Sequence, residues 1–483
     1  MIKLSVVPFL ALSAVAYSQS VVIRHVTVID GTGAPARPGM TVVIAGGRIA
    51  TIGKNANAPK DARTIDANGK FLIPGLWDMH GHPHRPDDLG LLIANGVTGV
   101  RVMGGLPWYH ETCAQIQNGQ LLGPRMTISS RLLDGPDPSQ PAAPANNDAA
   151  GVAKEWAEVM AGGRPRSLYV ANAADAHQAV LQSKQDGAEF IKIHDGLSRE
   201  AYFALAEESK KQGFLFVGHV PVGVSPAEAS DAGQKSIEHM QGILIACSTH
   251  EDQLRKVMEA LAGLPAGQRN AKMLEIQRET WETFSAEKAA MLAAKFVRNH
   301  TWQCPTLTSR GGTRERAGRS SEETLKYIPA SVRARWKRGL DATPAPSAEE
   351  REVAKKLDDK LLEVVGIMHR AGVQFLAGTD VGGVYLVPGF SVHDELADLV
   401  ETGFTPMQAL QSATSDAARF LGQEKDWGTI QKGKLADLVL LDANPLENIH
   451  NTRKIDAVIV NGRILEREKL EKILDQVWTS AQK

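Results

Sequence analysis

The stretch EFIKIHDG at residues 189–196 gives the clearest indication of the fold. Side chains alternate between the two faces of a β-strand, so Lys192 shares one face with Phe190 and His194, and the flanking isoleucines share the other. If the isoleucines pack under helices, Lys192 points inward, where an unpaired ammonium is costly. Three outcomes are open for this lysine. It can pair with an acid, its side chain can extend so that the ammonium reaches water at the mouth of the site, or the amine can be carboxylated to give a ligand for two cations.

Around this stretch the sequence alternates strand-like and helix-like segments, which indicates parallel strands joined by crossover helices. Eight strand-like segments occur: Leu72–Met79, Val97–Met103, Arg125–Ser129, Phe190–His194, Leu215–Val220, Ser236–Met240, Thr301–Leu307 and Gln374–Thr379. The fold class is therefore α/β, and eight is the number of strands in a TIM (β/α)8 barrel. We place this barrel at residues 74–427, with helical insertions at about 249–300 and 311–370.

Both ends of the chain have a different, β-rich texture. Residues 21–30 and 454–465 show short β-like apolar runs, and Asp-Gly and Gly-Gly pairs mark turns near the N-terminal end. We predict one small composite β-sandwich domain formed from both termini, residues 19–73 and 428–466. Residues 467–483 follow it as a C-terminal helix or tail.

The N-terminus, MIKLSVVPFLALSAVAYSQS, has the pattern of a signal peptide. One lysine precedes a short apolar run from Leu4 to Ala16, and small residues follow before Gln19. We predict a signal peptide over residues 1–18 and a periplasmic or secreted protein. The alternative is a buried N-terminal strand.

The composition limits the partners. The chain is 43% hydrophobic and 23% charged, with a formal net charge of −1. Near-neutral charge gives no reason to expect nucleic acid or a membrane surface, so the expected partners are a small-molecule substrate and further copies of this chain in a homo-oligomer. Three scattered cysteines are too few for a disulfide framework.

The sequence also predicts one long loop and the starts of two helices. The Pro-rich loop Asp134–Asn147 follows the third predicted strand and should lie over the C-terminal face of the barrel. Ser347 stands three residues before Glu350, and Ser391 three before Asp394. Each pair has the spacing of a capping box and predicts a helix start.

Residues able to bind metal lie at or near the C-terminal ends of five predicted strands. They are His80, His82, Lys192, His219, His239 and Asp380. A barrel brings the ends of its strands together around one axis, so all six can share one site at its mouth. If Met79 points outward, strand alternation directs His80 and His82 inward. Taken singly, each histidine is more often structural, and Asp380 is also a candidate helix N-cap.

This set of residues resembles the binuclear metal site of the amidohydrolase superfamily. The motifs IPGLWDMHGH, GVTGVR, GAEFIKI, GHV, SIEHM, CPTL, AGTD and GTIQKGKLADLVLLDANPL are similar to its imidazolonepropionase-like and Xaa-Pro dipeptidase-like branch. The resemblance covers residues 21–465 apart from the two helical insertions.

The resemblance implies a specific division of the ligands. His80, His82 and Asp380 would bind the more buried ion, and His219 and His239 the second. Carboxylated Lys192 would bridge both. Two divalent ions about 3.5–4 Å apart activate a bridging hydroxide and polarise a carbonyl; Zn²⁺ is expected, with Mn²⁺ or Fe²⁺ as alternatives. The catalytic residue Asp380 would move the proton from the hydroxide to the leaving amine.

Some positions depart from the family pattern. Arg101-Val102 stands where relatives often have Arg-Asp, and His84 and Arg85 follow the His-x-His motif where apolar residues are usual. His84 and Arg85 are candidate contacts for a substrate carboxylate, or else belong to an exposed polar loop. His393 is a further candidate substrate contact at the mouth.

The predicted function is therefore hydrolysis of an amide C–N bond in a small substrate, such as an N-acyl amino acid or a dipeptide. Opening of a cyclic amide, imidazolone or lactone ring is an alternative, because the same metal pair would serve. A non-catalytic secreted metal- or ligand-binding barrel is a second alternative. Deamination is disfavoured. Mononuclear deaminases of the fold that this sequence resembles carry an acid a few residues after the corresponding histidine, whereas His219 is followed by Val-Pro-Val-Gly.

Overall fold

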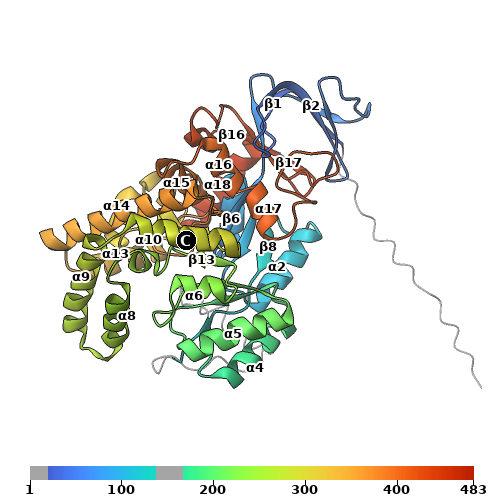
Figure 1. Ribbon diagram of the computed structural model, residues 1–483. Coiled ribbons are helices and arrows are strands. Elements are labelled where there is room, and N and C mark those ends of the chain that lie inside the picture. The colour runs from blue at the N-terminus through green and yellow to red at the C-terminus, as the bar shows by residue number, and fades with distance from the viewer. Residues whose placement is uncertain (1–19, 137–166, 483) are drawn as a thin grey trace, which may run out of the picture.

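Strands from both ends of the chain meet in a curved sheet at one end of the molecule, and most helices surround the remaining strands (Figure 1). This computed structural model describes residues 20–136 and 167–482. The predicted signal peptide, residues 1–18, lies outside the described residues, and so do residues 137–147 of the Pro-rich loop. The strands that carry the predicted site belong to the helical part.

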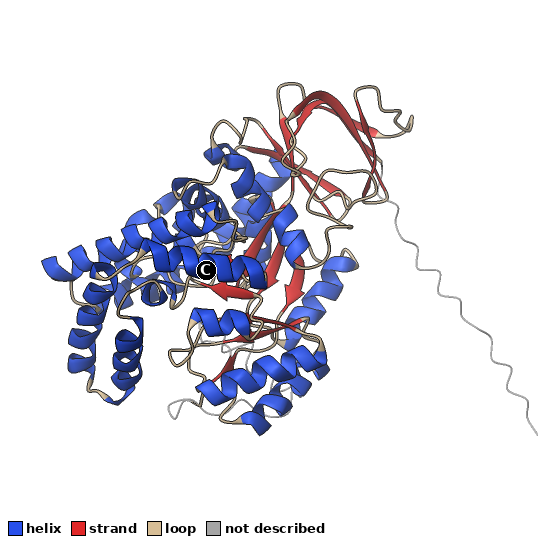
Figure 2. Ribbon diagram, viewed as in Figure 1, coloured by secondary structure: helices blue, strands red, loops and turns tan. Residues whose placement is uncertain are grey.

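The terminal strands form a single mixed sheet. Its members are β1 (Val21–Val28), β2 (Arg37–Ala45), β3 (Arg48–Gly53), β4 (Arg63–Asp66), β5 (Phe71–Pro74), β15 (Leu438–Leu441), β16 (Ile455–Val460) and β17 (Arg463–Glu466). The order is β17-β16-β15-β5-β1-β2-β3, with β4 beside β1. The sheet curves around its own apolar core, which includes Ile23, Val42 and Leu440 (Figure 2). The two termini do combine, but β5 and β15 pair directly, so the strands join edge to edge in one sheet instead of the two packed sheets of the predicted sandwich.

The central strands are all parallel and lie in two sheets. One holds β6 (Leu76–Gly81), β7 (Val97–Val102) and β8 (Arg125–Ile128). The other, in the order β10-β9-β11-β12-β13-β14, holds β9 (Leu133–Asp134), β10 (Leu168–Tyr169), β11 (Phe190–Ile193), β12 (Leu215–Gly218), β13 (Ser236–Glu238) and β14 (Trp302–Cys304). Isolated parallel bridges connect Ser129 with Phe190, Gln303 with Phe375, and Gly81 with Val381. The parallel pairings therefore run from β6 through to residues 375–381 and back to β6.

The first and last predicted strands differ from the structure. The segment Leu72–Met79 is divided, because β5 belongs to the terminal sheet and β6 begins the parallel set. The segment Gln374–Thr379 forms isolated bridges rather than a regular strand. The strands predicted between them are present, with ends that differ by a few residues.

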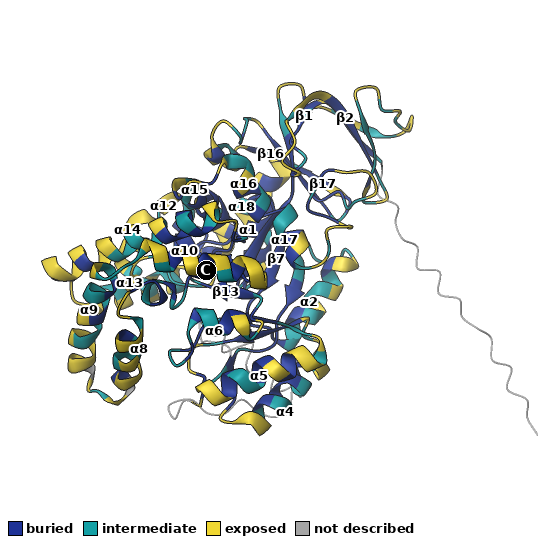
Figure 3. Ribbon diagram, in the orientation of Figure 1, coloured by how far each residue is buried: buried dark blue, intermediate teal, exposed yellow. Residues whose placement is uncertain are grey.

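Helices cover the parallel strands from outside. They are α1 (Pro86–Ala94), α2 (Pro107–Gln117), α4 (Ala173–Gln185), α5 (Arg199–Gln212), α6 (Pro226–Asp231), α7 (Ile243–Ala246), α8 (Glu251–Ala260), α9 (Ala266–Glu282), α10 (Ala286–Asn299), α11 (Thr313–Arg319), α12 (Glu322–Leu325), α13 (Ala330–Ala342), α14 (Ala348–Arg370), α15 (Phe390–Glu401), α16 (Pro406–Ser412), α17 (Ser415–Phe420) and α18 (Arg467–Ala481), with short 3-10 turns η1 (Leu261–Gly263), η2 (Leu307–Ser309) and η3 (Ile449–Arg453). The two predicted insertions are helical, as α8 to α10 and α11 to α14. Exposed residues gather on the outer faces of α8, α9 and α14, whereas the central strands are buried (Figure 3).

The two predicted helix starts have different outcomes. Ser347 caps α14, and its side chain exchanges hydrogen bonds with Glu350 in a capping box. Ser391 lies inside α15, which begins one residue earlier, and its hydroxyl accepts a hydrogen bond from the Val387 amide. Gly389, with a φ of 79°, provides the turn into α15 that a serine N-cap was expected to provide.

None of the helices in the described parts of the chain combines the length and apolar character that a membrane span needs. The three cysteines are free thiols; Cys247 and Cys304 are buried, and Cys113 is half-buried. The C-terminal helix α18 packs on α1, where Gly90 leaves room for Ile473.

Two tryptophans connect the parallel strands to the chain segment that precedes β15. Trp77 of β6 and Trp427 stack with ring centroids 4.0 Å apart and planes at 6°. Both are almost completely buried, and the Trp427 indole N–H donates to Gln423 at 2.7 Å. The stack therefore fixes the terminal sheet against the strand that carries His80.

We predict that Trp427→Ala lowers the free energy of unfolding by about 3–5 kcal/mol, because it removes a buried aromatic ring and leaves a cavity. Chemical denaturation would measure this loss. Trp478→Ala is the matched control, since Trp478 is 47% exposed; it should change stability by less than about 0.5 kcal/mol. Equal effects of the two substitutions would contradict a structural role for the stack.

Candidate metal centre

Lys192 is the most buried of the predicted ligands that carry a charge. It lies in β11, its side chain is 1% exposed, and its amide donates to the Ser130 hydroxyl at 3.0 Å. Among the described residues its Nζ has no hydrogen-bond partner. Burial lowers the pKa of this amine to about 8, although Glu238 and Asp380 oppose the shift. The predicted face is confirmed: Ile191 and Ile193 pack in the core under the helices, and Lys192 points away from it.

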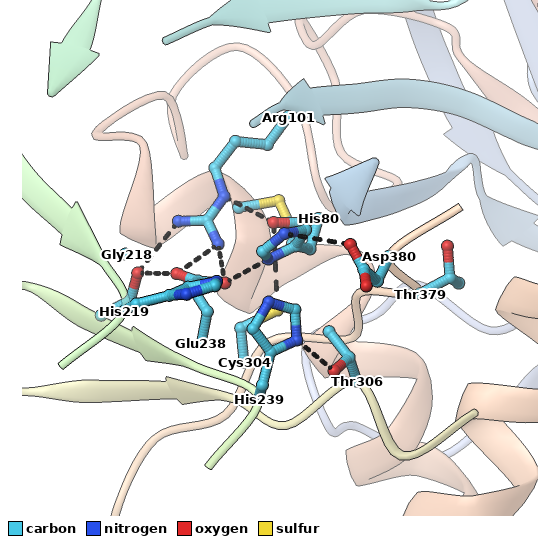
Figure 4. Close-up of polar contacts among 12 residues, drawn as sticks. His80, Arg101, Gly218, His219, Glu238, His239, Cys304, Thr306, Thr379 and Asp380 are labelled. Carbon is cyan, nitrogen blue, oxygen red and sulfur yellow. Dashed lines mark hydrogen bonds and ion pairs between the residues drawn. The ribbon is translucent and has the colours of Figure 1, made fainter. Parts of the chain in front are cut away.

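A network of buried polar groups orients His80. The Nδ1 of His80 lies 2.7 Å from a Glu238 carboxylate oxygen, and that carboxylate accepts hydrogen bonds from Arg101 at 2.9 and 3.0 Å (Figure 4). Arg101 also donates to the Ser236 hydroxyl and to the Met79 carbonyl. Arg101 and Glu238 are both completely buried. Because Glu238 engages Nδ1, the other ring nitrogen of His80 is directed toward Asp380, 3.5 Å away.

His239 joins this site through an unusual backbone conformation. In β13, Ser236 and Glu238 point toward Arg101, so simple alternation would direct His239 to the opposite face. Its φ of 60° turns the chain instead and brings the ring within 4.5 Å of the His80 ring, centroid to centroid. The Nδ1 of His239 bonds the Thr306 hydroxyl at 2.8 Å, which leaves Nε2 for the site (Figure 4).

Asp380 faces two histidines from the last segment of the parallel set. Its Oδ1 lies 3.5 Å from Nε2 of His80 and 3.4 Å from Nε2 of His82. Burial would raise the pKa of this carboxyl, but His239, His82 and His80 outweigh it and hold the pKa below its ordinary value. Asp380 also has a positive φ of 60°. Gly378, two residues before Asp380, admits no side chain, because a Cβ there would lie 2.5 Å from the Cys304 sulfur.

Asp78 fixes the two strand ends to each other. It accepts hydrogen bonds from the His80 amide at 3.1 Å, from the Thr379 amide at 3.0 Å and from the Thr379 hydroxyl at 2.5 Å. Burial raises the pKa of Asp78 to about 7, against these hydrogen bonds. The carboxyl thus sets the spacing between the His-x-His motif and Asp380.

His219 approaches from β12 and completes the set. Its ring lies 4.9 Å from that of His239 and 4.4 Å from that of His194. His194 in turn lies 2.9 Å from Asp134 and 2.7 Å from Asp195. Burial disfavours its charged form, but these two carboxylates outweigh burial and raise the pKa of His194 to about 9. His194 is therefore an imidazolium beside the site, already neutralised by its own acids.

The structure brings the six predicted residues together. Ligand atoms of His80, His239 and Asp380 lie within 4.8 Å of one another. His82 contacts Asp380, and Lys192 interacts electrostatically with His80, His219 and His239. The imidazoles of His80 and His239, each with one nitrogen oriented by a partner, together with the Asp380 carboxylate and the unpaired buried amine, make a donor set that fits divalent cations. Burial lowers the pKa of His80 and of His219 well below the ordinary value, which keeps both rings neutral for ligation.

A model of the Amidohydrolase family matches residues 91–465. The chain belongs to this family. Membership confirms the predicted superfamily and the prediction of a metal-dependent hydrolase acting on C–N bonds. Ochratoxinase from Aspergillus niger is 24% identical over 473 residues, covering 87% of this chain and 81% of that protein.

Solved structures have the same fold. A bottromycin amidohydrolase aligns with a TM-score of 0.71 and 24% identity, over 95% of this chain and 90% of the other. A Xaa-Pro dipeptidase with methionine bound in its active site aligns with a TM-score of 0.64 and 20% identity, over 93% of this chain and 100% of the other.

The three candidate substrate contacts of this amidohydrolase lie in three different environments. His84 stands beside His82, with ring centroids 6.0 Å apart, and burial lowers its pKa to about 3, so it is neutral. Arg85 caps α1 and pairs with Asp88 at 2.5 Å. His393 is completely buried between Thr452 and the Asn95 carbonyl. The expectation that His393 lies at the mouth was wrong, because its ring points from α15 toward Thr452 of η3 and Asn95 at the end of α1.

Sequence reasoning missed Glu238 and misplaced Met79. Glu238 precedes His239 in the motif SIEHM, and an acid inside an otherwise apolar strand was a signal for a buried charged partner. Met79 does not point outward: it packs in the same cluster as Phe190 and Cys304. The register between β6 and β7 shifts twice, so strict alternation fails where the His-x-His motif begins.

We predict that Glu238→Gln weakens zinc binding by about 10- to 100-fold, because Nδ1 of His80 loses its charged partner and Arg101 loses the carboxylate with which it forms an ion pair. Competition with a zinc chelator would measure this. The matched control is Glu395→Gln in α15. Glu395 is also completely buried, and burial raises its pKa above the ordinary value; within the described part of the chain it accepts a hydrogen bond from the Thr308 amide and none from the six predicted ligands. Zinc affinity should be unchanged in the control; equal losses in both variants would contradict the orienting role of Glu238.

His393 makes stability depend on pH. Burial lowers its pKa to about 3 in the folded protein, whereas the unfolded value is about 6.5. The neutral ring therefore contributes stability that is present above pH 6.5 and is lost as the pH falls toward 3. Between pH 7 and pH 5, with chelator present, the wild type should lose about 2 kcal/mol more unfolding free energy than His393→Gln. His450→Gln, which removes an exposed histidine, should follow the wild type; a parallel pH response in His393→Gln would refute the assignment.

Proposed function

We propose that this chain hydrolyses the amide bond of a small substrate, an N-acyl amino acid or a dipeptide, at a pair of divalent ions. The observation that carries the proposal is the Lys192 amine, buried without a hydrogen-bond partner among the described residues. Burial lowers the pKa of this amine, so a larger fraction of it than of an exposed lysine is in the neutral form, which is the form that adds carbon dioxide. The resulting carboxylate would lie beside the three histidines that already interact with Lys192.

The proposed ligand division follows the six residues described above. His80, His82 and Asp380 would hold one ion, His219 and His239 the other, and carboxylated Lys192 would join them. Imidazole and carboxylate ligands suit Zn²⁺, with Mn²⁺ or Fe²⁺ as alternatives. When bound, such ions lower the pKa of water and polarise the substrate carbonyl.

The protein's own residues would position and move the proton. The three histidines hold the pKa of Asp380 below its ordinary value and so keep it ionised. This carboxylate faces the site, where it would accept a proton from the attacking water and return it to the leaving nitrogen. Glu238 and Thr306 hold His80 and His239 in one orientation each, so these rings need no rearrangement during turnover. We also infer that the eight parallel segments act as a (β/α)8 barrel, whose strand ends present the ligands on one face.

The relatives support amide hydrolysis over the alternatives. Two of the solved structures with this fold are named as an amidohydrolase and a dipeptidase. Mass spectrometry distinguishes the alternatives. Cleavage of an acyclic amide gives two products, ring opening gives one, and a non-catalytic barrel gives none. The apolar run before Gln19 supports the further proposal that the mature enzyme is exported.

The test is turnover of a panel of N-acyl amino acids and dipeptides by zinc- or manganese-loaded protein. We expect two fragments from at least one member. Asp380→Asn should lower kcat by about 100- to 10,000-fold, because the proton transfer loses its base. Asp394→Asn, which removes an exposed carboxylate in α15, should leave kcat unchanged. No turnover of any member, or full activity of Asp380→Asn, would overturn the proposal.

A further inference from the structure

The second helical insertion carries an arginine to the rim of the metal centre. Arg316 lies in α11, and its Nη1 donates to the carbonyls of Ser309 at 2.8 Å and Gly311 at 2.9 Å. Its Nε donates to the carbonyl of Val384 at 3.1 Å. The side chain therefore spans the loop that follows β14 and the loop that follows Asp380.

Both anchoring loops lead directly to predicted metal ligands. The Ser309 hydroxyl lies 3.1 Å from that of Thr306, which orients His239. On the other side, Val384 follows Asp380 by four residues, and the Gly383 amide between them donates to the Asp380 carbonyl at 3.1 Å. Arg316 also interacts electrostatically with Asp380. Three hydrogen bonds to backbone carbonyls therefore hold the guanidinium in one position beside the site.

The remaining nitrogen of Arg316 is available. Nη2 has no hydrogen-bond partner in residues 20–136 and 167–482, and the half-buried side chain forms no ion pair there. Neighbouring arginines are occupied: Arg310 pairs with Asp398, and Arg319 donates to the carbonyls of Thr308 and Arg310. Arg85, the cation that the sequence suggested for a substrate carboxylate, is held by Asp88.

We propose that Arg316 binds the free carboxylate of the substrate and thereby makes the enzyme select N-acyl amino acids and dipeptides over uncharged amides. This inference rests on the proposed function. Nη2 of Arg316 can donate two hydrogen bonds, and the guanidinium carries one positive charge. A carboxylate, which accepts hydrogen bonds and carries one negative charge, matches this group. A dianionic group such as a phosphate would meet the same single cation next to the Asp380 carboxylate, so it is disfavoured.

The test compares Arg316→Met with the wild type on an N-acyl amino acid that the wild type hydrolyses and on its methyl ester, which lacks the charge. Losing a hydrogen bond to a charged group corresponds to about 10- to 100-fold. We expect kcat/KM for the acid to fall by that factor, mainly through KM, while kcat/KM for the ester is unchanged. Arg316→Lys should recover part of the preference, because it keeps the charge.

Arg319→Met is the matched control, since it removes the same side chain from the same helix. It should affect acid and ester equally, if at all, and all variants should keep the zinc content of the wild type. A purely structural role of Arg316 would instead lower turnover of acid and ester by the same factor. That result, or an unchanged preference in Arg316→Met, would overturn the inference and leave the proposed function standing.

Binding provides a readout that does not need turnover. An N-benzyl amino acid, in which an amine replaces the amide, and its methyl ester would be titrated calorimetrically into zinc-loaded protein. We expect the wild type to bind the acid at least about 10-fold more tightly than the ester and Arg316→Met to bind both alike. Absence of a preference in the wild type would reject the carboxylate site, even if the hydrolase panel succeeded.

Discussion

The buried amine of Lys192 is the constraint on which the rest of the site depends. An ammonium removed from water without a partner is strongly unfavourable, so its surroundings must either deprotonate it or give it a new chemical form. The structure places it among three imidazoles that burial keeps neutral and near two carboxylates, Glu238 and Asp380. The two carboxylates favour the ammonium, whereas burial opposes it; divalent cations at the site would offset the repulsion between these carboxylates and a carboxylated Lys192.

Buried hydrogen bonds hold the strand ends that carry His80, His239 and Asp380. Arg101 and Glu238 form a completely buried ion pair, and such a pair is valuable mainly when every hydrogen bond is made, as it is here through Ser236, Met79 and His80. Positive φ values at His239 and Asp380 add local strain, which the surrounding packing sustains. The terminal sheet contributes through the Trp77–Trp427 stack, which holds β6 in place. Precision at the metal centre therefore comes from contacts far along the chain.

The sequence was sufficient for the features that follow strand periodicity. Lys192 faces away from the flanking isoleucines as alternation requires, and the six ligand candidates converge because parallel strands end on one side. Alternation failed at Met79, where a register shift reverses the faces. Ser391 showed the limit of a capping pattern, because a left-handed glycine started the helix one residue earlier. Arg316 had no signal at all, since its position depends on how a long insertion folds back over the rim.

The central proposal is that Lys192 is carboxylated and bridges two cations. Anomalous diffraction from crystals of the zinc-loaded protein, grown with bicarbonate, tests this directly. The account predicts two anomalous peaks, one beside His80, His82 and Asp380 and one beside His219 and His239, with density for a carboxyl group on the Lys192 amine between them. A single peak, or a free Lys192 amine in fully loaded protein, would contradict it.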